Sequence, residues 1–168
     1  MAIKKLKNTF VLLSLGANIG DMKSTLESAI AKLSEQRAVA NIVKSSYYKT
    51  EPYGVRNQDW FLNLCVSGYT SLTPFELLEK CKFIEKHYGR KEREKWQKRE
   101  LDIDIIFYDN EIIESKELTI PHQEYLMRNF VLIPASEIAG DYIPPLSEYN
   151  LSQLASMCDD KSWVEKIN

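Results

Sequence analysis

The sequence predicts an α+β fold in which helices pack on an antiparallel sheet. Apolar segments with strand character alternate with two amphipathic helical segments, in the order β-α-β-β-α-β of the ferredoxin-like split βαβ unit. Turn and helix-cap residues separate these segments. The length of 168 residues suits one domain, so we expect a single domain over 1–168. We further expect both helices on one face of the sheet and a C-terminal extension that packs on the domain.

The first half of the chain predicts three strands and one helix. Residues 9–15 are continuously apolar, which is typical of a central strand. A turn with glycines at its two ends follows, and a helix is expected from about residue 21 because apolar residues then recur at helical spacing. Residues 39–49 are rich in β-branched and aromatic side chains and predict the second strand. Residues 60–70 predict the third.

The second half begins with a well-defined helix start. Thr73 can cap the helix, Pro74 suits its first position, and Glu76 completes a capping box, so we expect a helix to about residue 87. Residues 101–108 predict the fourth main strand. The C-terminal part predicts a short strand pair within 112–120 and helices at 130–139 and 151–157.

Composition excludes several classes of protein. With 44% hydrophobic and 27% charged residues, the chain is an ordinary globular protein and not a disordered one. Three cysteines without C-x-x-C spacing and two histidines argue against a structural zinc site and indicate reduced thiols in a cytoplasmic protein. Lysines before the apolar residues 10–15 resemble a signal peptide, but six residues are too few, and a buried strand explains them better. We expect no membrane segment.

The small net charge of −2 hides a basic segment. Residues 86–99 hold seven basic side chains and two acidic ones, while the rest of the chain holds 15 basic and 22 acidic residues. A generally basic nucleic-acid binder is therefore unexpected, whereas a local anion site is consistent with the pattern.

Asp102-Ile103-Asp104 is the most informative motif. On a strand, residues two apart point to the same face, roughly 6.6 Å apart along the axis. Two such carboxylates can hold Mg²⁺, which takes its other ligands from water and substrate phosphates. The alternative is a half-exposed strand whose polar face happens to be acidic.

Arginines near this motif favour phosphoryl transfer. Arg90 and Arg99 lie in the basic segment just before the acidic pair, and an arginine can grip a phosphate with two hydrogen bonds. The lysines of the segment are interpreted as solvated. The sequence holds no G-x-x-x-x-G-K-[ST] motif, which excludes a P-loop kinase, and no G-x-S-x-G motif. His122 follows a proline and is either a ligand contact or a structural histidine.

Together these residues resemble the 6-hydroxymethyl-7,8-dihydropterin pyrophosphokinase family. Members transfer pyrophosphate from ATP to the pterin hydroxymethyl group in folate biosynthesis. The similarity runs in family order from about residue 10 to residue 139. Its pieces are Leu15-Gly-Ala-Asn18, Tyr48-Lys-Thr-Glu-Pro-Tyr-Gly54, Phe61-Leu-Asn63, Gly89-Arg90, Trp96 to Arg99, Leu101-Asp-Ile-Asp-Ile105, Leu118-Thr-Ile-Pro-His122, and Arg128 with Phe130.

The resemblance implies a role for each matching position. Asp102 and Asp104 would bind two Mg²⁺ ions, and Arg90 and Arg99 would act in a mobile catalytic loop. ATP would contact Glu85, Arg99, Ile105, Thr119, His122 and Arg128, and the pterin would contact Thr50, Tyr53, Asn63, Trp96 and Phe130. The implied substrates are ATP and 6-hydroxymethyl-dihydropterin, with no nucleic-acid partner, and we expect a monomer.

The sequence also departs from the family pattern. Gln97-Lys98 stands where Gly-Pro is usual, Gln123 where Tyr is usual, and Glu117 at a basic position, and the loop before Trp96 is one residue shorter. Two alternatives to the enzyme therefore stay open. One is a paralogue that binds pterin or nucleotide with weak or no transfer, and the other is a non-catalytic ferredoxin-like module that binds nucleotide or RNA.

Overall fold

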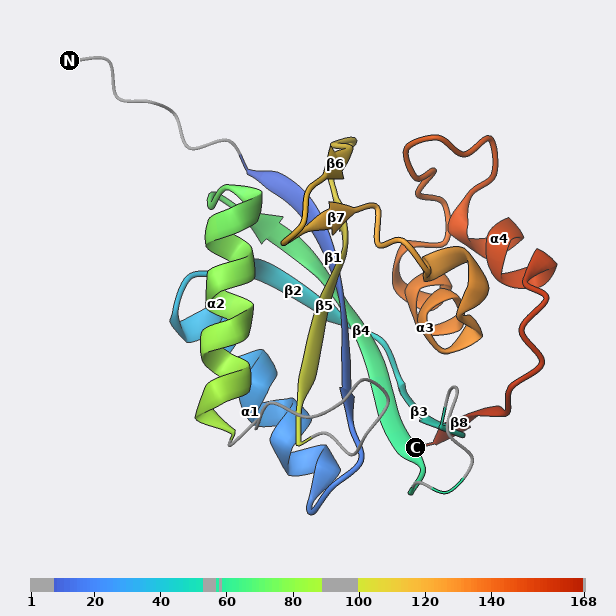
Figure 1. Ribbon diagram of the computed structural model, residues 1–168, viewed down its shortest axis with the longest axis horizontal. Coiled ribbons are helices and arrows are strands. Elements are labelled where there is room, and N and C mark those ends of the chain that lie inside the picture. Colours follow the sequence, from blue (N-terminus) through green and yellow to red (C-terminus); the bar gives the residue numbers. More distant parts are fainter. Residues whose placement is uncertain (1–7, 53–56, 58, 89–99, 168) are drawn as a thin grey trace.

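A six-stranded antiparallel sheet forms the centre of the fold in a computed structural model that describes residues 8–52, 57, 59–88 and 100–167 (Figure 1). Its strands are β1 (Thr9–Ala17), β2 (Ala40–Lys44), β3 (Tyr47–Thr50), β4 (Phe61–Thr70), β5 (Asp102–Tyr108) and β8 (Val164–Ile167). They lie in the order β5-β1-β4-β3-β8, and β2 pairs with β4 beyond β3. A separate pair, β6 (Ile113–Glu114) and β7 (Thr119–Ile120), follows β5. The predicted α+β fold with an antiparallel sheet is confirmed.

Helices cover both faces of this sheet. Figure 1 shows α1 (Met22–Glu35) and α2 (Pro74–His87) on one side, and α3 (Asn129–Ala139) with α4 (Leu151–Met157) on the other. A 3₁₀ turn, η1 (Tyr125–Met127), precedes α3. The two helices of the predicted β-α-β-β-α-β unit, α1 and α2, lie on one face as expected, and the C-terminal part of the chain adds a second helical layer on the other face. The predicted helices and the short strand pair are all present.

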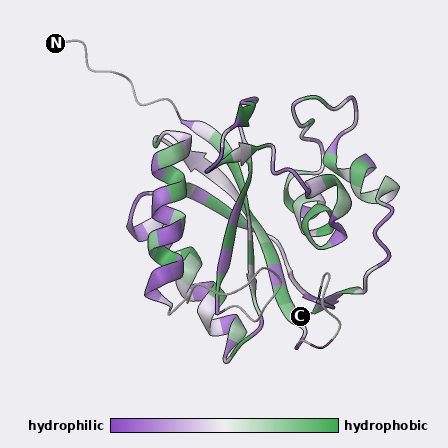
Figure 2. Ribbon diagram, viewed as in Figure 1, coloured by the Kyte–Doolittle hydropathy of each residue, from purple (hydrophilic) through white to green (hydrophobic). Residues whose placement is uncertain are grey.

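Each helical layer encloses its own apolar core, and Figure 2 shows hydrophobic and hydrophilic residues interleaved along α1 and α2, as expected of amphipathic helices. Beneath α1 and α2, the fully buried residues include Leu13, Leu15, Leu26, Leu77 and Ile84. Beneath α3 and α4, they include Leu12, Cys65, Ile106, Phe107 and Leu132. The second set explains the second layer, because strand residues on that face are apolar and need cover.

The helix start predicted at Thr73 is confirmed. The Thr73 hydroxyl accepts a hydrogen bond from the Glu76 amide at 3.3 Å, and the Glu76 carboxylate accepts one from the Thr73 amide at 2.7 Å. These bonds satisfy two amides that the first turn leaves without helical partners.

The expected strand over 39–49 is instead divided into β2 and β3. At Ser45 the main-chain amide donates to the Cys65 carbonyl at 2.9 Å, but the Cys65 amide donates to the Ser45 hydroxyl at 3.0 Å. A side chain thus replaces a main-chain carbonyl in the ladder, which ends the regular pairing. Strand β8 lies in the extension for which the sequence predicted packing alone.

Candidate active site

The floor of the candidate site is a row of paired residues across three strands. Gly16 of β1 lies opposite Asp102 of β5 on one side and opposite Asn63 of β4 on the other. Directly opposite residues of antiparallel strands point to the same face, so Asp102 and Asn63 share a face. Asp104 lies opposite Ser14 in the next row of that face. Asp102 and the predicted pterin-binding amide of Asn63 therefore flank a residue without a side chain.

Glycine at position 16 is required by the Asn63 side chain. A Cβ atom on Gly16 would lie 2.3 Å from the Asn63 Oδ1 atom, which is far inside van der Waals contact. The sequence suggested that this glycine opens a turn, but it lies within β1. Its function in the fold is close approach and not chain reversal.

Asn63 and Thr50 form the predicted pterin side of the site. The Asn63 amide donates a 2.6 Å hydrogen bond to the Thr50 hydroxyl, and both residues are buried. This bond fixes which edge of the amide faces the sheet surface. A fixed polar group beside an aromatic side chain is what a flat heterocycle requires. The Arg128 guanidinium lies 5.6 Å from the ring centroid of Phe130, the predicted stacking residue.

Arg128 connects the acidic pair to the segment that follows β7. Its guanidinium lies 4.0 Å from the Asp104 carboxylate and forms an ion pair with Glu124. Arg128 is buried, and the Asp104 side chain is 38% exposed. A buried arginine held against a partly exposed carboxylate can contact a phosphate that the same carboxylate binds through a metal ion. Glu124 was not among the predicted site residues, although its spacing of four from Arg128 is a recognisable ion-pair signal.

His122 is anchored to β5 and stays neutral. Its main-chain amide donates to the Ile106 carbonyl at 3.0 Å, and its Nδ1 atom accepts from the Glu124 amide at 3.2 Å. The proton of the neutral ring is therefore assigned to Nε2, which can donate to a ligand oxygen. Burial, followed by the nearby Arg128 charge, lowers the pKa of His122 to about 4.

Glu85 of α2 binds the main chain between the two acidic residues. Its carboxylate accepts a 2.8 Å hydrogen bond from the Ile103 amide, and it is buried. The Ile105 side chain lies in the core beneath α1 and α2, so a nucleotide would reach this residue through its main chain. Thr119 is half-buried on β7. The predicted ATP contacts of these three residues stay predictions.

The residues present fit a magnesium site that depends on substrate. Asp102 and Asp104 supply oxygen ligands from one strand face, while the described residues hold no group of three or more histidine, cysteine, aspartate or glutamate side chains arranged to hold a metal ion by themselves. Mg²⁺ is commonly bound by one or two carboxylates plus phosphates and water. Four predicted site residues lie outside the described residues, namely Tyr53, Arg90, Trp96 and Arg99.

The cysteines offer no nucleophile at this site. Burial raises the pKa of the Cys65 thiol to about 12 and also raises that of Cys81. Cys158 is half-buried, and all three are free. Within the described parts of the chain, no helix combines the length and apolarity that crossing a membrane requires.

The fold is of the ferredoxin-like class, and Asp102, Asp104 and Arg128 provide groups of the kind that bind phosphate directly or through a metal ion. Residues 12–140 match the profile of the family described as 7,8-dihydro-6-hydroxymethylpterin-pyrophosphokinase. The chain belongs to this family. It is 44% identical over 136 residues to the 2-amino-4-hydroxy-6-hydroxymethyldihydropteridine pyrophosphokinase of Aquifex aeolicus, covering 81% of this chain and 84% of that one. It is 42% identical over 131 residues to that of Bacillus subtilis, covering 78% of both chains.

Solved structures support the fold. A crystal structure of wild-type Plasmodium falciparum HPPK-DHPS superposes with a TM-score of 0.68 at 16% identity, covering 90% of this chain and 45% of that chain. A complex of the same wild-type protein with pteroate gives a TM-score of 0.70 at 15% identity, covering 90% and 42%. This chain thus spans less than half the length of those proteins. At such low identity the superposition establishes the ferredoxin-like fold and nothing finer.

Proposed function

We propose that this chain transfers pyrophosphate from ATP to the hydroxymethyl group of 6-hydroxymethyl-7,8-dihydropterin, giving the pterin diphosphate and AMP. The proposal is supported by family membership and by relatives of 34–44% identity that are named for this enzyme. These matches lend no support to a non-catalytic nucleotide- or RNA-binding module.

One observation in the structure carries the proposal. Asp102 and Asn63 share one sheet face with Gly16 between them. Neighbouring strands lie about 4.8 Å apart, so the two side chains start about 10 Å from each other. That spacing suits a pterin bound beside the phosphates of a nucleotide. Helix α3 covers the same sheet face beside Leu12, Cys65 and Ile106. The uncovered part of that face is therefore the part that carries Asp102 and Asn63.

Positioning and charge neutralisation would supply most of the catalysis. Asn63, held by Thr50, would orient the pterin ring so that its hydroxymethyl oxygen attacks the β-phosphorus in line. Arg128 would stabilise negative charge on the phosphates, and neutral His122 would donate from Nε2 to the nucleotide. Mg²⁺ held by Asp102 and Asp104 would neutralise phosphate charge. Arg90, Arg99 and Trp96 are proposed to close over the substrates, and Tyr53 to form an apolar wall.

Finer parts of the proposal stay predictions. These are a count of two Mg²⁺ ions, a monomeric chain and a cytoplasmic location. The first is supported by two carboxylates on one strand face, a pair that two ions about 3.5–4 Å apart could share. Equilibrium dialysis of Mg²⁺ with a non-hydrolysable ATP analogue measures the stoichiometry, and sedimentation measures the mass in solution.

The test is AMP formation from ATP and Mg²⁺, with and without 6-hydroxymethyl-7,8-dihydropterin. We expect AMP to appear only when the pterin is present. Pterin binding without AMP would favour the paralogue that has lost transfer. If the chain neither bound the pterin nor formed AMP, the proposed function would be contradicted.

A further inference from the structure

Asn129 lies between two residues of the proposed site, Arg128 and Phe130, and is itself buried. Its main-chain amide donates to the Asp160 carboxylate at 3.1 Å. Its side-chain amide donates to the main-chain carbonyls of Asp160 at 3.1 Å and Ser162 at 2.7 Å. Three hydrogen bonds thus hold the start of α3 to a segment more than 30 residues later.

The acceptors for these bonds are themselves fixed. The Asp160 carboxylate also accepts from the Ser162 amide at 2.9 Å and from the Ser162 hydroxyl at 2.6 Å. Asp160 therefore closes a local turn and binds Asn129 at the same time. Because this turn is already ordered by its own hydrogen bonds, it loses less conformational entropy on binding Asn129 than a flexible segment would.

The same segment contacts the opposite side of the site. Strand β8 pairs with β3 so that Val164 lies opposite Thr50. The Trp163 amide donates to the Glu51 carboxylate at 2.6 Å, and the Glu51 amide donates to the Trp163 carbonyl at 3.2 Å. We call residues 160–167 the C-terminal brace, because they bind both the start of α3 and the strand that carries Thr50.

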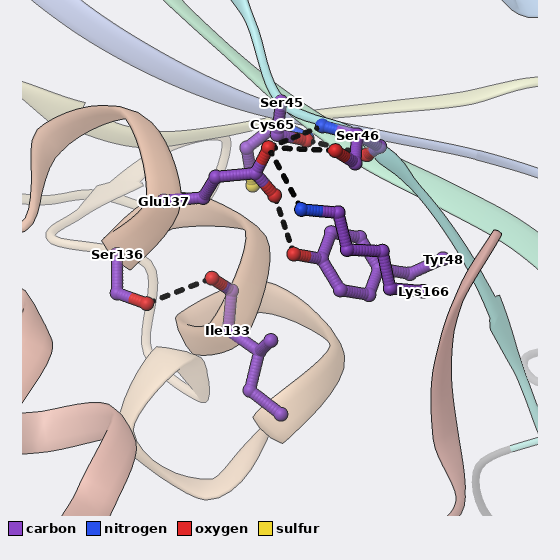
Figure 3. Close-up of polar contacts among 8 residues, drawn as sticks. All are labelled: Ser45, Ser46, Tyr48, Cys65, Ile133, Ser136, Glu137 and Lys166. Carbon is purple, nitrogen blue, oxygen red and sulfur yellow. Dashed lines mark hydrogen bonds and ion pairs between the residues drawn. The ribbon is translucent and has the colours of Figure 1, made fainter. Parts of the chain in front are cut away.

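A third contact lies near the end of α3. Figure 3 shows Glu137 facing Ser46, Tyr48 and Lys166, the last of these on β8. The Glu137 carboxylate accepts from the Ser46 amide at 2.9 Å and from the Tyr48 hydroxyl, and it lies 3.8 Å from the Lys166 ammonium. Helix α3 is thus held near both of its ends. The brace binds its first residue, Asn129, and β3 and the brace together bind Glu137 near its last turn.

Asn129 carries a cost that stability alone does not explain. Its Oδ1 atom is buried and has no hydrogen-bond partner among the described residues. A buried acceptor without a partner is unfavourable, and a functional role is one of the reasons for which native proteins keep such a group. The side-chain amide is nevertheless required, because its NH₂ group makes the two bonds to the brace.

We propose that Asn129 is a positioning residue, through which the C-terminal brace fixes Arg128 and Phe130 relative to Thr50. The inference rests on the proposed function, which assigns Arg128 to the nucleotide and Phe130 to the pterin. The brace lies beyond residues 12–140, which match the family profile, so this support is supplied by another part of the chain. Asn129 contacts neither substrate in this proposal and acts through its two neighbours.

The test compares Asn129→Ala with Asn150→Ala in the full chain. Asn150 caps α4 by accepting from the Gln153 amide at 2.9 Å, so its loss destabilises a neighbouring helix without touching Arg128 or Phe130. We expect Asn129→Ala to raise the KM for 6-hydroxymethyl-dihydropterin about fivefold or more, equivalent to about 1 kcal/mol, and to raise the KM for ATP in the same direction. The kcat should stay within about threefold of wild type. Asn150→Ala should lower Tm and leave both KM values unchanged.

Asp160→Asn is the second variant. It tests whether the brace positions Arg128 and Phe130 if Asn129→Ala does not fold. It removes the anionic acceptor of the Asn129 main-chain amide. We expect both KM values to rise, as in Asn129→Ala. In the double variant the effects should be less than additive, because the two changes break different hydrogen bonds of the same contact between the start of α3 and the brace. Unchanged KM values in both single variants, or an equal rise in Asn150→Ala, would overturn the inference. A wild-type chain without pterin-dependent AMP would instead overturn the proposed function.

Discussion

Replacing Gly16 by alanine places a methyl group against the amide proposed to bind the pterin. The new Cβ atom would lie 2.3 Å from the Asn63 Oδ1 atom and 3.5 Å from its Cγ atom. Because the third nearest atom is the Leu62 carbonyl oxygen at 3.9 Å, the clash falls almost entirely on Asn63. The Asn63 side chain must then move, and its 2.6 Å hydrogen bond to Thr50 is lost or distorted.

Two costs follow from this displacement. Overpacking a buried position costs about 1–3 kcal/mol of folding stability, and losing the hydrogen bond costs about 1 kcal/mol more. If the displaced amide also loses its bond to the pterin, affinity falls by at least about 1.4 kcal/mol, or about tenfold in KM. The KM for ATP should change little, because the three heavy atoms nearest to the new methyl group belong to Asn63 and Leu62 and none belongs to Asp102.

The assay is steady-state AMP formation at varied pterin and ATP, with thermal unfolding measured in parallel. Gly68→Ala is the matched control. It lies on β4, and its Cβ would meet the Val39 side chain at 2.5 Å and the Ala40 carbonyl at 2.6 Å, five residues from Asn63. It should lose stability without a change in the KM for pterin. A wild-type pterin KM in Gly16→Ala, or an equal rise in Gly68→Ala, would refute the reasoning.

Three further predictions concern the acidic pair, the buried histidine and Thr50. Asp102→Asn and Asp104→Asn should each lower Mg²⁺-dependent turnover by at least about 100-fold while Tm stays near that of wild type, and near-normal turnover in both would contradict the metal assignment. Because the pKa of His122 falls from 6.5 to about 4 on folding, the unfolded chain binds more protons between these pH values. In denaturant titrations with EDTA, the free energy of unfolding should therefore decline by up to about 3 kcal/mol as pH falls through this range, and His122→Gln should flatten the decline. Thr50→Val should raise the KM for pterin about fivefold, because the Asn63 amide loses its acceptor, and Thr50→Ser should restore it.

The fold was predictable where local signals and packing agree. The capping residues Thr73 and Glu76 start α2 as their spacing indicates. The division of the second strand was not predictable, because it depends on the Ser45 hydroxyl meeting a main-chain amide 20 residues away. Strand β8 is short, and it forms because β3 leaves an edge to which it can pair.

The site was predictable only where a local sequence pattern determines how side chains are placed. Asp102 and Asp104 share a face because alternation along a strand fixes it. That Gly16 lies between Asp102 and Asn63 depends on strand order and register, which no local pattern shows. The contacts of Arg128 with Asp104 and of Asn129 with Asp160 also join distant parts of the chain. Residue types alone therefore indicate the chemistry, while the partners of each residue require the fold.

The bond between Glu85 and the Ile103 amide has a consequence for solubility. Among the residues that the structure describes, β5 is the outermost strand of the sheet, and its outward amides would otherwise offer a template to another chain. A carboxylate from α2 takes one of these amides, at the residue between Asp102 and Asp104. An added strand would have to break this hydrogen bond and leave the buried Glu85 side chain without the Ile103 amide, which is unfavourable. The edge that carries the acidic pair can thus stay accessible to small molecules while resisting aggregation through strand addition.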